Sequence, residues 1–204
     1  MGKSNEFGLR YMKGNILKSV TFTQAGGRAL NAPKQMLVMA AGAVFERGGA
    51  VSAWTRDDDS GKWTHTLVRH GSNAGGVRWV PRDMQVYRDK VTGKEKLFLL
   101  IGNPGLMTGV YSPDEPGGIR WSRHAEFPFL TQGSFATRPL GITEANDTLI
   151  FSVGGSLYRR NDGERPTYTE ILNLGDEAYT DVGCIRGLST IANPNGNGES
   201  ILLL

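Results

Sequence analysis

Short runs of β-branched, aromatic and aliphatic residues recur along the chain, each ended by a turn of Gly, Asn or Asp. The pattern is clearest in residues 138–172, where TLIFSV (148–153) is rich in β-forming residues and ends at a Gly-Gly pair. Asn161-Asp162-Gly163 is a strong hairpin signal. We therefore expect four antiparallel strands here, at residues 138–143, 148–153, 156–160 and 167–172.

The same order of strands and turns is found in two earlier segments. Residues 82–126 predict strands at 83–87, 96–101, 109–112 and 119–123. Residues 28–68 predict strands at 35–41, 51–56 and 62–68. The segment QMLVMAA (35–41) has helical propensity, but it occupies the place of a second strand and is followed by Gly42, so we expect a strand.

Both ends of the chain predict half of such a unit. Residues 7–23 predict two strands around Gly14-Asn15, which we assign as the third and fourth strands of a unit. Residues 185–204 predict a first and a second strand. The two halves together make about four units in all. Either the ends join to close a ring, or the chain is a piece of a larger ring, which the apolar end at Leu204 favours.

A repeated tripeptide supports this division. The pattern Arg, any residue, Leu or Met recurs about every fifty residues, which is the length of one four-stranded propeller blade. It begins at Arg28, Arg82, Arg138 and Arg186. We therefore predict an all-β, single-domain β-propeller over residues 1–204, with blades at 28–68, 82–126 and 138–172 and half-blades at 7–23 and 185–204.

The composition is typical of a protein with many short strands and argues against some classes of function. Glycine accounts for 28 of 204 residues and 39% are hydrophobic, enough for a folded core. The net charge of +3 comes from interspersed acidic and basic residues, so we expect no nucleic-acid partner. No signal peptide and no membrane-spanning run is predicted, so we expect a soluble protein. The sequence does not indicate its cellular compartment. The single Cys184 excludes an internal disulfide.

Three predicted hairpins resemble the Asp-box turns of sialidase-like propellers, whose pattern is Ser-x-Asp-x-Gly-x-Thr-Trp. They are Asp57 to Trp63, Ser112 to Trp121, and Asn161-Asp162-Gly163 followed by Tyr168. The resemblance implies a propeller fold in which these turns are structural and remote from the active site. It also implies that an arginine cluster would hold the carboxylate of an acidic sugar.

The four repeated arginines are the candidate ligand-binding residues. Arg28, Arg82, Arg138 and Arg186 are expected where connecting loops enter the first strands, so they could form a partial ring at the mouth of the channel. Guanidinium groups bind carboxylate, sulfate or phosphate through paired hydrogen bonds. The alternative is that each arginine makes the same structural contact to a neighbouring blade.

No other cluster predicts a particular chemistry. Tyr179 with Glu177 or Asp181 could serve as nucleophile and base of a glycosidase, but the spacing does not single them out. Asp57-Asp58-Asp59 could hold calcium, although a solvated turn is favoured. Three scattered histidines, His65, His70 and His124, predict no metal site, and we expect no cofactor.

These observations predict a binding module more strongly than an enzyme. We expect a non-catalytic binding or scaffold propeller that recognises a ligand, such as an anionic small molecule or glycan, or a protein partner at the channel mouth. The alternative is a sialidase-like glycoside hydrolase acting on an acidic glycan. We expect no membrane partner. An incomplete ring would expose sheet faces and favour an oligomer.

Overall fold

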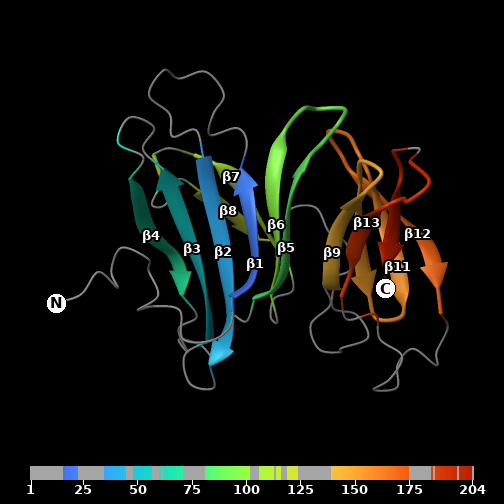
Figure 1. The fold of residues 1–204 in the computed structure, drawn as a ribbon, viewed down its shortest axis with the longest axis horizontal. Helices are drawn as coiled ribbons and strands as arrows, with labels where there is room; N and C mark the ends of the chain where they lie inside the picture. Colours follow the sequence, from blue (N-terminus) through green and yellow to red (C-terminus); the bar gives the residue numbers. More distant parts are fainter. Residues whose placement is uncertain are drawn as a thin grey trace.

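The protein is described by a computed structural model over residues 16–22, 35–44, 48–56, 60, 62–70, 81–101, 106–112, 114–115, 119–123, 139–174, 185, 187–196 and 198–203. All regular secondary structure in this part of the chain is β-strand, and every strand pairing is antiparallel (Figure 1). The predicted all-β class with four-stranded antiparallel sheets is therefore confirmed.

Sheet A is the first four-stranded sheet, and its strand order follows the chain. Its strands are β1 (Ile16–Phe22), β2 (Gln35–Val44), β3 (Gly48–Arg56) and β4 (Trp63–His70). The expected strand at QMLVMAA is confirmed as β2. The assignment of residues 16–23 to a separate half-blade is wrong for β1, because β1 pairs with β2 as the first strand of this sheet.

Sheets B and C repeat this order. Sheet B consists of β5 (Pro81–Arg88), β6 (Glu95–Ile101), β7 (Leu106–Tyr111) and β8 (Ile119–Arg123). Sheet C consists of β9 (Pro139–Ala145), β10 (Thr148–Val153), β11 (Ser156–Asn161) and β12 (Thr167–Asn173). The Asn146-Asp147 turn between β9 and β10 has positive φ at both residues, as a tight two-residue hairpin requires.

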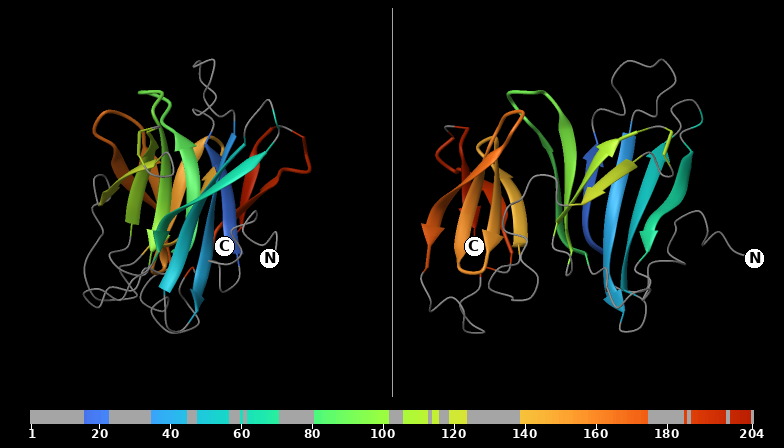
Figure 2. Two further views of the ribbon diagram at one scale, coloured as in Figure 1. Left: turned by 90° about the vertical axis from the view of Figure 1, so that its left-hand side faces the viewer. Right: turned by 180° about the vertical axis from the view of Figure 1, so that it is seen from behind.

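Sheet D has two described strands, β13 (Ser189–Ala192) and β14 (Ser200–Leu203). The view from behind shows β5 and β6 of sheet B between sheet A and sheet C (Figure 2). The strand contacts agree, because β1 lies against β5, β5 against β9, and β9 against β13.

Each junction between sheets contains its own apolar cluster. The first, between A and B, has Met84, Leu97, Leu99, Met107 and Ile119 at its centre with Val20 packed against them. The second, between B and C, contains Tyr87, Phe98, Leu100, Leu106, Ile142, Leu149, Phe151 and Val153. The third, between C and D, contains Ala145, Ile150, Leu157, Ile185 and Leu188. Sheets B and C therefore bury both faces, as strands between two layers do.

Candidate functional site

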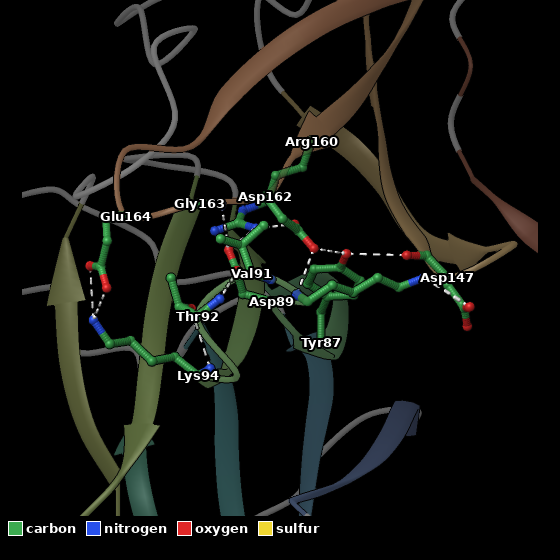
Figure 3. Close-up of polar contacts among 11 residues, drawn as sticks. Tyr87, Asp89, Val91, Thr92, Lys94, Asp147, Arg160, Asp162, Gly163 and Glu164 are labelled. Carbon is green, nitrogen blue, oxygen red and sulfur yellow. Dashed lines mark hydrogen bonds and ion pairs between the residues drawn. The ribbon is translucent and has the colours of Figure 1, made fainter.

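The most concentrated polar cluster of the described residues joins two hairpin turns from neighbouring sheets (Figure 3). One turn connects β5 to β6 in sheet B, and the other connects β11 to β12 in sheet C. The cluster consists of Tyr87, Asp89, Arg160 and Asp162, which we call the inter-sheet latch. The side chains of Arg160 and Asp89 are 2% and 4% exposed, so their charges are almost fully removed from water.

Asp89 is bound by donors from both turns. Its Oδ1 accepts hydrogen bonds from the backbone N–H groups of Val91 (3.0 Å) and Thr92 (2.8 Å). Its Oδ2 accepts from Arg160 Nη1 (2.7 Å) and from the backbone N–H of Gly163 (3.0 Å). Burial alone would raise the pKa of Asp89, but the N–H groups of Thr92 and Gly163 and the Arg160 guanidinium outweigh it and lower the pKa.

Asp162 completes the latch from the other side. Its Oδ2 accepts from the Tyr87 hydroxyl (2.7 Å) and from the backbone N–H of Lys90 (2.8 Å), and its Oδ1 accepts from Arg160 Nη1. Burial, followed by the hydrogen bond to Asp162, raises the pKa of Tyr87 and keeps its hydroxyl protonated. The guanidinium carbon of Arg160 lies 5.8 Å from the Tyr87 ring centre and 5.9 Å from that of Phe98.

Two exposed ion pairs flank the latch. Lys90 Nζ lies 2.8 Å from Asp147 Oδ2, and Lys94 Nζ lies 3.0 Å from Glu164 Oε2. Both pairs connect a turn of sheet B to a turn of sheet C, but their exposure makes each worth little for stability. The latch and these two ion pairs therefore bind charged groups of sheet B to charged groups of sheet C, which is the arrangement of a structural joint.

A second polar junction lies where the first strands begin. Asp83 Oδ1 accepts from Lys18 Nζ (2.9 Å) and from the backbone N–H of Met84 (2.8 Å). Its Oδ2 accepts from the backbone N–H of Ile142 (2.9 Å), whose carbonyl accepts from Lys18 Nζ (3.3 Å). One carboxylate thus connects β1, β5 and β9, the first strands of sheets A, B and C.

The residues of this junction lie next to a β-bulge that β1, β5 and β9 have in common. The first strand of each four-stranded sheet has a bulge at its second residue. The bulged residues are Leu17, Arg82 and Leu140, and regular pairing resumes at Lys18, Asp83 and Gly141. The backbone register therefore makes Arg82 the counterpart of Leu140. Arg138 precedes that counterpart by two positions.

The four predicted ligand-binding arginines fall at different places in the chain order of the strands. Arg28 belongs to the connection between β1 and β2, which leaves from the end of sheet A opposite to the start of β1. Arg82 is the bulged second residue of β5. Arg28, Arg138 and Arg186 lie outside the described residues, and for Arg82 only the backbone is described. The anion-binding role of these arginines stays a prediction.

The other candidates are only partly within the described ranges. His65 and His70 fall in β4. The candidates outside the described residues are Glu177, Tyr179, Asp181, His124, Cys184 and Asp57-Asp58-Asp59. Across the described ranges, no group of three or more His, Cys, Asp or Glu side chains is placed to hold a metal ion. The predicted turn Asn161-Asp162-Gly163 is present, and its Asp162 and Gly163 bind the neighbouring sheet.

Sequence reasoning named the Asp162 turn but missed Tyr87, Asp89 and Arg160. A signal was present: Arg160 follows Tyr158 by two residues and therefore shares its face of β11, and Asp162 follows two residues later. Asp89 also precedes Thr92 and Gly93 in a pattern typical of an Asp-started turn. Neither signal reveals which distant turn supplies the partner.

Comparison with known proteins gives no match to this chain, whether by family, by curated sequence or by solved structure. In the part of the chain that the structure describes, no helix is long and apolar enough to span a membrane.

Proposed function

We propose that this chain is a non-catalytic binding module of the β-propeller type, with sheets A to D as successive blades. The proposal is supported by the chain-order succession of sheets, by the contacts between successive first strands, and by the bulge repeated at the start of each first strand in sheets A to C. Each blade would bury its faces against its neighbours, as sheets B and C do.

The observation that carries the proposal is the strand order, which brings the start of β5 and the connections before β9 and β13 to one end of the sheets. At the latch end, Arg160 binds Asp89, Lys90 binds Asp147 and Lys94 binds Glu164, which is a structural joint between sheets B and C. The opposite end is where β8 connects to β9 and β12 connects to β13. Because these connections contain Arg138 and Arg186, and Arg82 is the second residue of β5, which starts there, this end would carry the anion-binding groups.

We propose that an acidic sugar or another small carboxylate, sulfate or phosphate is the ligand at that end. A guanidinium pairs with such groups through two parallel hydrogen bonds, and several arginines around one pocket would add affinity and select against neutral sugars. Arg28 does not take part in this proposal, because its connection leaves from the latch end of sheet A.

Isothermal titration calorimetry with N-acetylneuraminate, glucuronate and inorganic sulfate tests the proposal, with galactose as a neutral control. We expect binding of at least one anion, and a loss of affinity of about tenfold or more for Arg138→Gln or Arg186→Gln. Arg159→Gln, at an exposed arginine of β11, is the matched control and should bind as the parent does. Absence of binding, or binding that both site variants retain, contradicts the proposal.

The same protein should be incubated with a fluorogenic sialoside. Our proposal expects no release of the fluorophore. Release that is lost in a Tyr179→Phe variant would instead assign the chain to the alternative, a sialidase-like hydrolase with a tyrosine nucleophile.

A further inference from the structure

The Asp83 junction contains a cation whose donors are not all used by the described residues. Lys18 Nζ donates to Asp83 Oδ1 (2.9 Å) and to the carbonyl oxygen of Ile142 (3.3 Å), and among the described residues these two oxygens are its acceptors. A lysine ammonium has three N–H donors, so one donor remains. The Lys18 side chain is 29% exposed, so a molecule from solvent can reach it.

Lys18 stands at the same end of the sheets as the proposed anion site. Lys18 and Asp83 are counterparts, because each resumes regular pairing directly after the bulge of its first strand. Arg82 is the bulged residue before Asp83, and Arg138 directly precedes β9, the strand of Ile142. The Lys18 side chain therefore reaches from β1 to β5 and β9 close to where Arg82 and Arg138 occur in the chain.

The carboxylate of this ion pair does not depend on Lys18 alone. Asp83 Oδ1 also accepts from the backbone N–H of Met84 (2.8 Å), and its Oδ2 accepts from the backbone N–H of Ile142 (2.9 Å). Hydrogen bonds of this kind stabilise the charged form of a carboxyl group. The Asp83 side chain is 14% exposed, about half as much as that of Lys18. The positive member of the pair is therefore more accessible to an anion from solvent than the negative one.

We propose that Lys18 is a ligand-binding residue, whose remaining N–H donates to the carboxylate, sulfate or phosphate of the bound anion. A lysine binds such a group as a point charge, whereas a guanidinium presents two parallel donors. Lys18 would therefore fix one oxygen of the anion from the first strands, and the arginines would pair with its other oxygens. The inference rests on the proposed function and adds to it a residue that the arginine repeat does not predict.

Calorimetric titration with N-acetylneuraminate, glucuronate and inorganic sulfate tests this inference on the 204-residue chain. Lys18→Met keeps the apolar stem but removes the charge, so it should weaken binding of the anion that the parent binds by about tenfold or more. Lys18→Arg keeps a cation there and should bind more tightly than Lys18→Met. Lys62→Met, at an exposed lysine before β4, is the matched control and should bind as the parent does. Far-ultraviolet circular dichroism checks that each variant is folded.

Asp83→Ala separates a binding role from a structural one, because it breaks the same ion pair from the other side. If Lys18 binds the anion, Asp83→Ala should retain or increase the affinity, since it frees the ammonium and removes a nearby negative charge. If the pair only holds the strands together, Asp83→Ala and Lys18→Met should change the affinity alike. Equal effects, or an unchanged affinity of Lys18→Met, overturn the inference and leave the anion-binding proposal standing. A parent protein that binds none of the anions overturns both.

Discussion

Arg160 is the residue on which the latch depends, because one buried guanidinium serves two carboxylates. Its own burial lowers its pKa, but Asp89 and the other negative groups outweigh this and raise the pKa, so the charge persists inside the protein. One guanidinium cannot neutralise two carboxylates, so backbone N–H groups also stabilise the negative charge. The N–H groups of Thr92 and Gly163 donate to Asp89. A buried ionic cluster is stable only when its remaining hydrogen-bonding capacity is satisfied in this way.

We expect Arg160→Met to lower the free energy of unfolding by about 3–5 kcal/mol, because it keeps much of the side-chain volume but leaves Asp89 and Asp162 buried without their cation. Urea denaturation followed by circular dichroism measures this change. The neighbouring Arg159 is exposed, so Arg159→Met should change stability by no more than about 0.5 kcal/mol. Equal effects of the two substitutions would contradict a structural role for the latch.

The lowered pKa of Asp89 predicts a loss of stability in acid. Because the folded-state pKa lies below the unfolded value of about 3.9, ionised Asp89 contributes its full stabilisation above that value and loses it as the pH falls further. The urea midpoint of the parent should therefore fall between about pH 5 and pH 2. Asp89→Asn, which cannot titrate, should show a shallower fall over the same interval. Parallel curves for the two proteins would show that Asp89 is not the group responsible.

At the scale of elements, the sequence predicts strands well where local chemistry decides the outcome. TLIFSV and IRWSR form β10 and β8 with the predicted bounds, because each run of β-forming residues follows a turn pair, Asn146-Asp147 in one case and Gly117-Gly118 in the other. The N-terminal segment was assigned to the wrong sheet for a physical reason. The pattern of residues 16–22 predicts a strand, but the choice of its partner depends on β2, which lies beyond the connection 23–34.

The latch could not be predicted from the sequence for a similar reason. Asp89 and Gly163 are far apart in the chain, and nothing local indicates that the turn after β5 meets the turn after β11. The repeat of arginines was likewise detected by spacing alone. Its members differ in register, because the bulge that defines the start of a first strand falls on Arg82 in one sheet and on Leu140 in the next.

Gly141 allows β9 to approach the residues before β13. A Cβ added to Gly141 would lie 2.9 Å from the backbone N of Leu188 and 3.0 Å from the carbonyl carbon of Gly187. Backbone atoms cannot move aside cheaply, so we expect Gly141→Ala to destabilise the protein by about 1–3 kcal/mol. Hydrogen exchange should show reduced protection of β13 and β14, with β5 and β6 much less affected.

Gly187→Ala is the matched control on the other side of this contact. Nothing lies within 4 Å of a Cβ added there, and no positive φ is required. It should leave both the stability and the exchange of β13 close to the parent. The packing argument is wrong if Gly141→Ala is tolerated as well as Gly187→Ala.

At the scale of the whole molecule, the arrangement of sheets depends on a few polar contacts placed between apolar clusters. The clusters bring neighbouring faces together but are non-directional, so they do not by themselves fix the register of one sheet against the next. The latch fixes sheet B against sheet C at one end, and Asp83 connects sheets A, B and C at the other. Each sheet of this central part is therefore held by directional bonds as well as by burial.

The Asp83 junction leads to a prediction about cooperativity. Asp83→Ala removes the acceptor of both Lys18 and the backbone N–H of Ile142, leaving groups near the junction without a partner, and should cost about 1–3 kcal/mol. Because Asp83 contacts both β1 and β9, its loss should also uncouple sheet A from sheet C. Hydrogen exchange at rising urea concentration should show β1, β5 and β9 losing protection together in the parent, whereas β1 should lose it first in the variant.

Asp114→Ala is the matched control, at an exposed aspartate after β7, and should behave as the parent does. If β1 and β9 still open together in Asp83→Ala, the apolar clusters alone couple the sheets, and the carboxylate serves only local pairing.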